Sequence, residues 1–193
     1  MSRARGHGVE IENEDALLTP PRLIIRPEEG GFPHLAQRPR LVLDPKVGDP
    51  PQDLEGGMSG YWLVSGRLKK AFTEIDSDAF EFVECDYRLP DGTEGPTYYL
   101  CEVARELDAV DEEASKFRVN VDGGYPGGKF YDLRGGASLA FKREVVGDSH
   151  VFRSPYSGDL VFCDRMFRDA IRGAGIGSDR ETRGLRFKDA FRI

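Results

Sequence analysis

The stretch from Tyr61 to Tyr87 constrains the fold most, because its pattern predicts a strand, a helix and a second strand in succession. Tyr61-Trp62-Leu63-Val64 is an aromatic and β-branched run that fits a largely buried strand. Ser65 stands where a helix N-cap should stand, since its side-chain oxygen can accept from a free N–H group of the first turn. Phe80 to Cys85 returns to a strand-like pattern. The apolar residues between them recur at the spacing of one helical face: Leu68, Ala71, Phe72 and Ile75.

The last thirty residues repeat this pattern. Leu160 to Cys163 is a strand-like run, Asp164 is placed as an N-cap, and Gly173 and Gly175 are placed to end the helix. The helix face comprises Phe167, Ala170 and Ile171, and Leu185 to Phe187 would supply the next strand. We therefore predict an α+β fold with a mixed, mainly antiparallel sheet, a few short helices and two similar strand-helix-strand units that pack on that sheet. A chance match of two common patterns is the alternative.

The middle of the chain adds shorter elements. The turn Pro90-Asp91-Gly92 and the strand-like run from Tyr98 to Val103 predict a hairpin that spans Phe80 to Val103. Apolar and polar residues alternate over residues 117–121, which indicates another strand. Residues 104–115 fit either a short acidic helix or a structured loop, and 137–146 fit either a strand or a helix.

Prolines divide the chain unevenly. Eight of the twelve lie in the first 58 residues, where they interrupt every helical period and leave only short extended pieces such as Leu23-Ile24-Ile25 and Leu41-Val42-Leu43. We predict a proline-rich arm over residues 1–40, partly mobile over about its first sixteen residues, and a single α+β domain over residues 41–193. The two apolar triplets could lie along a sheet edge or in a groove of that domain.

Composition favours a cytoplasmic protein. No apolar run approaches the length that crosses a bilayer, and no apolar segment follows the basic residues at the N-terminus, so a secretory signal is not expected. Three widely spaced cysteines, Cys85, Cys101 and Cys163, each lie in an apolar run, which favours reduced structural thiols.

Charge is distributed asymmetrically. Between Ala71 and Ser115 there are fourteen acidic residues and two arginines, which gives this stretch a net charge of −12. Residues 164–193 have a net charge of +3. Such an acidic middle should repel nucleic acid and anionic membranes and could attract a basic partner protein. The alternative is an acidic surface that serves only solubility.

Motifs for catalysis or cofactor binding are weak. Gly123 to Lys129 has the spacing of a phosphate loop, but Phe130 occupies the position of the magnesium-binding hydroxyl and no helix is predicted to follow. Cys163 paired with His150 is the best nucleophile and base, although an apolar strand is a poor place for a reactive thiol. No spacing indicates a zinc site. The tail could form a basic stripe with Phe187 and Phe191 interleaved, through Arg165, Arg168, Arg172, Arg180, Arg183 and Arg186.

Taken together, these residues resemble the myxobacterial-type immunity-protein domain, a bacterial family associated with polymorphic toxin systems. The resemblance extends over roughly residues 41–190 and is carried by scaffold motifs. These motifs are Ser59 to Ser65 with Leu68 and Phe72, Tyr98 to Val103, Leu107 to Asp111 with Ser115, Leu160 to Asp164, and Gly184 to Phe187.

The resemblance implies a non-enzymatic protein that binds a cognate toxin, encoded by a neighbouring gene, and protects the producing cell. It implies no catalytic, cofactor or metal residues, and a monomer or a homodimer is equally compatible. We expect the acidic middle to cover a basic active site of the toxin. The residues expected to bind are Asp76, Asp78, Glu81, Asp108, Asp111, Glu112 and Glu113. The alternatives are an enzyme that uses Cys163 or the Gly123–Lys129 loop, and an adaptor that acts through its N-terminal arm.

Overall fold

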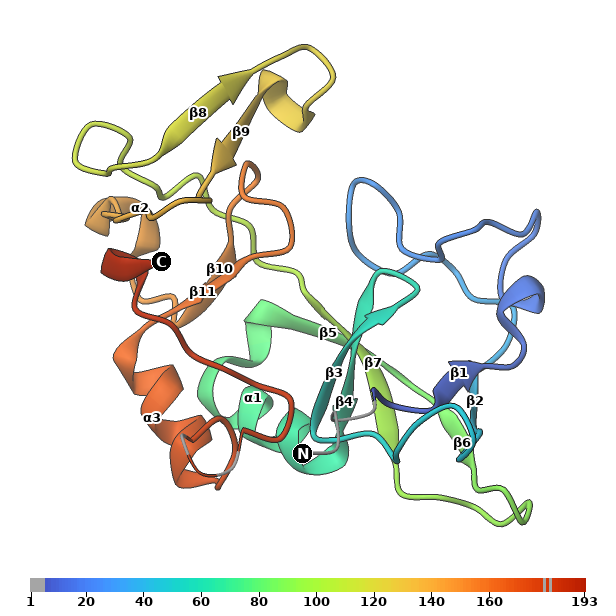
Figure 1. The fold of residues 1–193 in the computed structure, drawn as a ribbon. Coiled ribbons are helices and arrows are strands. Elements are labelled where there is room, and N and C mark those ends of the chain that lie inside the picture. Colours follow the sequence, from blue (N-terminus) through green and yellow to red (C-terminus); the bar gives the residue numbers. More distant parts are fainter. Residues whose placement is uncertain (1–5, 179, 181) are drawn as a thin grey trace.

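A four-stranded antiparallel sheet forms the centre of the protein. The computed structural model describes residues 6–178, 180 and 182–193. The strand order in the central sheet is β3-β4-β7-β5, and β5 and β7 form the predicted hairpin (Figure 1). The bounds are Leu54–Met58 for β3, Tyr61–Ser65 for β4, Phe80–Glu84 for β5 and Tyr98–Val103 for β7.

Three smaller sheets surround this centre. The first has the order β1-β2-β6, in which β1 pairs antiparallel with β2 and β2 pairs parallel with β6. The others are the antiparallel pairs β8-β9 and β10-β11. The bounds are Val9–Ile11 (β1), Arg40–Leu43 (β2), Asp86–Arg88 (β6), Arg118–Val121 (β8), Lys129–Asp132 (β9), Val151–Arg153 (β10) and Val161–Cys163 (β11).

The helices are short, and both of the longer ones begin at the predicted caps. Helix α1 is Gly66–Asp76 and α3 is Arg165–Gly173, while α2, Arg143–Val146, is a single turn. Ser65 Oγ accepts a hydrogen bond from the Leu68 N–H at 3.2 Å, and Asp164 Oδ1 accepts one from the Phe167 N–H at 2.7 Å. The 3₁₀ turns are Glu14–Ala16 (η1), Ser77–Ala79 (η2), Pro126–Gly128 (η3) and Ala190–Arg192 (η4).

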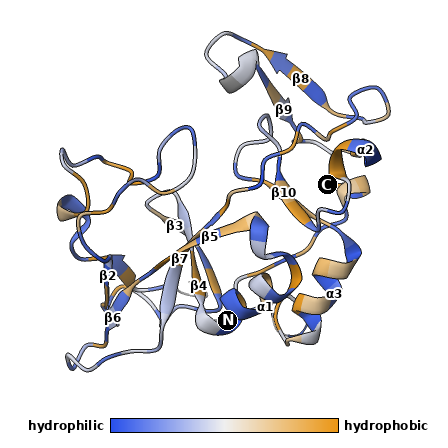
Figure 2. Ribbon diagram, turned by 180° about the vertical axis from the view of Figure 1, so that it is seen from behind, coloured by the Kyte–Doolittle hydropathy of each residue, from blue (hydrophilic) through white to orange (hydrophobic). Residues whose placement is uncertain are grey.

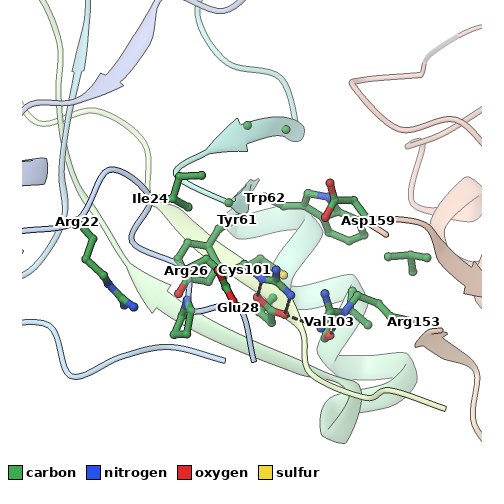
Figure 3. Close-up of a pocket in the computed structure, with 16 residues that line it drawn as sticks. Arg22, Ile24, Arg26, Glu28, Tyr61, Trp62, Cys101, Val103, Arg153 and Asp159 are labelled. Carbon is green, nitrogen blue, oxygen red and sulfur yellow. Dashed lines mark hydrogen bonds and ion pairs between the residues drawn. The ribbon is translucent and has the colours of Figure 1, made fainter. Parts of the chain in front are cut away.

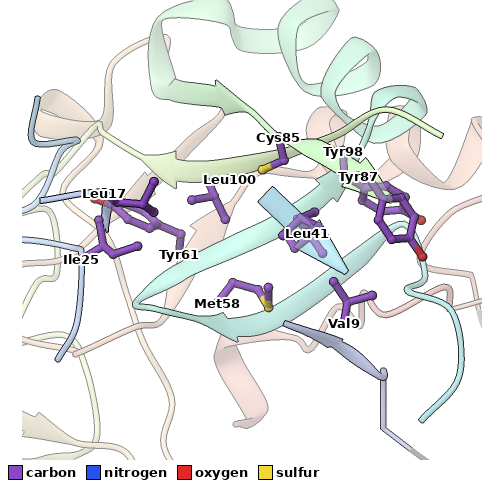
Figure 4. Close-up of a cluster of buried hydrophobic side chains, with 11 residues drawn as sticks. Val9, Leu17, Ile25, Leu41, Met58, Tyr61, Cys85, Tyr87, Tyr98 and Leu100 are labelled. Atoms are coloured by element: carbon purple, nitrogen blue, oxygen red, sulfur yellow. The ribbon is translucent and has the colours of Figure 1, made fainter. Parts of the chain in front are cut away.

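The alternation of side chains along the central strands sends their apolar residues into two different cores. Leu63 and Leu100 point to the first core, and their neighbours Val64 and Cys101 point to the second. The first core lies under the N-terminal segment (Figure 4), and the second lies under α1 and α3, whose Phe72 and Phe167 rings are 5.5 Å apart. In Figure 2, hydrophobic colours follow β5, β7 and β10, and α1 and α3 each carry hydrophobic and hydrophilic parts.

A third core supports the β8-β9 hairpin. It joins the loop after β7 to β9, β10 and β11 through six buried residues, which are Ala109, Val110, Tyr131, Leu139, Phe152 and Phe162. Residues 104–115 form a loop without a helix, and 137–146 end in α2, which settles both alternatives that the sequence left open.

The arm predicted for residues 1–40 supplies several residues to the first core. β1 pairs with β2 across the predicted boundary, and Leu17 and Ile25 are fully buried beside Leu41. The neighbouring Leu23 is 95% exposed. The division at residue 41 stays a prediction, but residues on both sides of it share one core.

The second strand-helix-strand unit differs from its prediction in two ways. Among the described residues, strand β11 pairs only with β10 and does not join the central sheet, and Leu185 to Phe187 form no strand. The side chains of Leu185 and Phe187 nevertheless pack against the second core. Their apolar pattern therefore reflects burial, whereas strand pairing also requires a neighbouring backbone at hydrogen-bonding distance.

Candidate functional site

The seven acids predicted to bind a partner fall into two groups. Asp76, Asp78 and Glu81 lie between the end of α1 and the start of β5, and the other four lie in the loop between β7 and β8. Within the described residues no hydrogen bond or ion pair connects the two groups. We call the first group the first patch and the second group the loop patch.

In the first patch, Asp76 is a structural residue. Its carboxylate pairs with Arg105 and accepts the backbone N–H of His150 at 3.0 Å, and its side chain is only 9% exposed. Burial alone would raise the pKa of Asp76, but the bonds from Arg105 and His150 outweigh burial and lower it. Asp78 and Glu81 are exposed, and their carboxylates form no ion pair within the described part of the chain.

The loop patch is held by two of its own members. Asp111 Oδ1 accepts the N–H groups of Glu113 and Ala114, each at 3.1 Å, which shapes the turn. Glu112 Oε1 accepts from Lys129 Nζ at 2.5 Å and from the Tyr131 hydroxyl at 2.7 Å, and these bonds lower the pKa of Glu112. Asp108 and Glu113 are exposed, and neither side chain forms a hydrogen bond with another described residue. These two side chains are therefore available to a partner.

The acidic middle is partly neutralised by folding. Seven of its fourteen acids form ion pairs within the described residues: Glu74, Asp76, Glu84, Asp86, Glu102, Glu106 and Glu112. The sequence balance of −12 consequently overstates the charge that a partner would meet.

A cavity of about 650 Å³ lies between the N-terminal segment, the β3-β4 hairpin, β7 and the β10-β11 pair (Figure 3). At its wall, the carboxylate of Glu102 is buried between two arginines. Arg26 donates to it at 2.6 and 2.8 Å, and Arg153 Nη2 lies 3.1 Å from Oε1. Because both carboxylate oxygens are engaged, Glu102 joins the N-terminal segment and β10 to the central sheet and is poorly placed to act as a general base.

A second buried acid supports the first helix cap. Asp53 accepts from Ser65 Oγ at 2.6 Å and from Arg67 Nη2 at 2.5 Å, and it also pairs with Arg183. Burial would raise the pKa of Asp53, but these three partners outweigh burial and lower it. Sequence reasoning missed both buried acids, because Arg26 and Arg183 are 76 and 130 residues from their partners and no local pattern connects them.

The cysteines do not have the surroundings of nucleophiles. Burial raises the pKa of Cys85 and of Cys163 to about 12, and it also raises the pKa of Cys101. The nearby His150 uses Nδ1 to contact Asp164 Oδ2 at 2.8 Å. Within the described residues no group of three His, Cys, Asp or Glu side chains could hold a metal ion.

The glycine-rich loop does not have the geometry of a phosphate loop. Pro126–Gly128 form a single 3₁₀ turn, and Lys129 begins strand β9 where a phosphate site would require a helix. Lys129 Nζ is bonded to Glu112 and lies 4.1 Å from the centre of the Tyr156 ring. The lysine therefore has a structural partner in place of a phosphate.

Four of the six arginines predicted as a tail stripe, Arg165, Arg168, Arg172 and Arg186, line one cleft with Phe187 and Phe191. This cleft lies between β11, α3 and the C-terminal segment. Arg183 pairs with Asp53 instead, and Arg168 also pairs with Asp169 at 2.7 Å, while Arg165 and Arg186 are exposed. None of the described helices has the length and apolar character needed to span a bilayer.

Comparison with known proteins places the chain by family. No curated protein matches it. The model of one family, described as the immunity protein family (Imm11), matches residues 1–191. This match includes the proline-rich segment that the sequence motifs did not cover. Because it spans nearly the whole chain, the protein belongs to the immunity protein family (Imm11).

Proposed function

We propose that this protein is a non-enzymatic, cytoplasmic immunity factor that binds a cognate toxin domain, encoded by a neighbouring gene, and covers its active site. The observation that carries this proposal is the family match over residues 1–191, because an immunity protein acts by neutralising a toxin. The burial of the thiols and the engagement of Lys129 support the absence of catalysis at the two sites that the sequence offered.

The proposed contact surface is acidic. Asp78, Glu81, Asp108 and Glu113 are the exposed acids that would meet the toxin, and Asp76, Asp111 and Glu112 would hold them in place through the bonds described above. A toxin that acts on a phosphate-containing substrate needs a cationic active site, so an acidic surface would speed association and compete with that substrate.

Calorimetry and stopped-flow association with the purified product of the neighbouring gene, each at two salt concentrations, test the proposal. The informative variant is Asp108→Lys with Glu113→Lys, because these side chains make no bonds within the described protein. The matched control is Glu10→Lys with Asp15→Lys, which makes the same change in net charge at exposed positions of the N-terminal segment.

We expect the loop variant to associate about tenfold more slowly at low salt and to lose much of its salt dependence, and the control to behave like the wild type. Failure of the wild type to bind would overturn the proposed function. Tight binding with equal rates for both variants would retain the function and remove the loop patch from the interface. The exposed apolar Leu23 and Ile24 would then be the next residues to substitute.

A further inference from the structure

The segment Leu185–Lys188 resembles an unpaired strand. Its exposure alternates, because Leu185 and Phe187 are half-buried against the second core while Arg186 and Lys188 are exposed. The N–H and C=O groups of residues 186–188 form no hydrogen bond with any other described residue. In Figure 1 the red trace of this segment runs uncoiled from the loop after α3 toward the C-terminus. Unpaired backbone groups in an alternating segment are a template for an added strand.

A cleft of about 810 Å³ borders this segment and offers apolar contacts. The cleft lies between β11, α3 and the C-terminal residues, and its walls include Phe162, Phe187 and Phe191. Leu160 and Phe191 are 44% and 65% exposed, so apolar surface remains accessible in a protein whose other phenylalanines are all buried or half-buried. The cleft can therefore receive apolar side chains of a ligand beside the free backbone.

The edge of the same cleft is cationic. Arg165, Arg186 and Lys188 line it, and none of them forms an ion pair with another described residue. The two acids in the lining are already engaged: Asp164 caps α3 and contacts His150, and Asp189 Oδ1 accepts the Phe191 N–H at 3.0 Å. In a chain with a net charge of −7, this is a local surface for negative charge.

We propose that an acidic, extended peptide segment of a partner protein binds in this cleft and adds as a strand to Leu185–Lys188. Main-chain hydrogen bonds to alternate residues of 186–188 would hold the segment, its alternate apolar side chains would contact the phenylalanines, and its carboxylates would meet Arg165, Arg186 and Lys188. A peptide fits better than a nucleic acid, because the site offers free backbone groups in strand order and a long polyanion would also meet the acidic patches.

This site shares no residue with the acidic surface of the proposed function, so each can fail without the other. The probe is a fluorescein-labelled octapeptide of alternating glutamate and valine, titrated with the full chain in the absence of any toxin and followed by anisotropy. A second peptide in which prolines replace the valines cannot donate the ladder hydrogen bonds from those positions.

We expect the glutamate–valine peptide to bind the wild type, and Arg186→Glu with Lys188→Glu to weaken binding at least tenfold. Lys46→Glu with Lys116→Glu, the same charge change at exposed lysines outside the cleft, should leave binding unchanged. Hydrogen exchange should slow at least tenfold at the amides of alternate residues in 186–188, those whose N–H groups face the added strand, when the peptide is saturating.

Three results would overturn the proposal. They are equal affinity for the two double variants, equal affinity for the valine and proline peptides, and tighter binding of a ten-nucleotide poly-dT strand than of the glutamate–valine peptide. The last result would mean that the cleft recognises phosphates.

Discussion

The two strand-helix units start alike and end differently. In both, a strand leads to a cap whose side chain accepts a first-turn N–H, Ser65 in one unit and Asp164 in the other, and the helix then buries a phenylalanine. Strand β4, however, lies between β3 and β7, and the chain returns as β5. In the described part of the chain, β11 has one partner strand and the returning segment Leu185–Lys188 has none. Caps and helix faces are therefore encoded locally, but strand pairing depends on which distant segments supply a neighbour.

Truncation of the helix phenylalanines should produce the largest effects. The Phe72 ring stacks on Phe80 with 4.4 Å between centroids and also contacts Trp62 and Phe167. We expect Phe72→Ala to lower the free energy of unfolding in urea by about 3–5 kcal/mol, and Phe167→Ala to cost about 3 kcal/mol, because the second unit packs on fewer strands. The double variant should cost less than the sum, since the two rings touch. A larger loss of unfolding free energy for Phe167→Ala than for Phe72→Ala would contradict the expectation that the first unit is packed more extensively.

The buried carboxylate beneath the first cap gives the second largest effect. Asp53→Asn should lower the free energy of unfolding by about 1–3 kcal/mol at pH 7. This loss is smaller than that expected for breaking a fully buried ion pair, because Arg67 and Arg183 are half-exposed. The pKa of Asp53 is lowered in the folded protein, so its contribution is complete above the unfolded value near 3.9 and is lost as pH falls through the lower folded pKa.

Urea unfolding from pH 7 to pH 3 measures this contribution. The difference between wild type and Asp53→Asn should shrink below about pH 4. Asp15→Asn, at an exposed acid without bonds in the described structure, should show no difference at any pH. A difference for Asp53→Asn that stays constant with pH would mean that shape, and not charge, sets the loss.

Sequence reasoning succeeded where the cause is local. The caps at Ser65 and Asp164, most of the two helix faces and the β5-β7 hairpin follow from spacing and turn chemistry within about twenty residues, and the structure confirms them. Ala170, which the spacing predicted for the buried face of the second helix, is exposed. The family, too, was recognisable from such scaffold motifs.

Features made by distant residues could not be predicted in this way. Glu102 lies in β7 and Asp53 immediately precedes β3, yet their partners Arg26 and Arg183 come from the two ends of the chain. The charge count likewise treated all fourteen acids of the middle as available, whereas only the fold determines which of them meet an arginine or lysine. For the same reason, the pattern of Leu185 to Phe187 could not reveal that this segment pairs with no strand among the described residues.

Substitution of the caps should have a moderate effect and tests how alike the two units are. Ser65→Ala and Asp164→Ala should each cost about 1 kcal/mol, because each leaves a first-turn N–H without its acceptor. Asp164→Ser should recover most of the loss in the second unit, since a serine oxygen can accept the same bond. Thermal unfolding with calorimetry measures all three variants. A loss for Asp164→Ser as large as that for Asp164→Ala would assign the role of Asp164 to its contact with His150.

The smallest effect should come from two exposed arginines that occupy different environments in the two units. Arg67→Ala removes a partner of Asp53 and should cost about 0.5–1 kcal/mol, because the guanidinium is half-exposed. Arg186→Ala should change the free energy of unfolding by less than about 0.5 kcal/mol, because this side chain is exposed and unpaired within the described residues. Urea titrations of the two variants give the comparison directly. A loss above about 1 kcal/mol for Arg186→Ala would mean that the returning segment of the second unit stabilises the folded protein through this side chain, and would contradict the expected contrast between the two units.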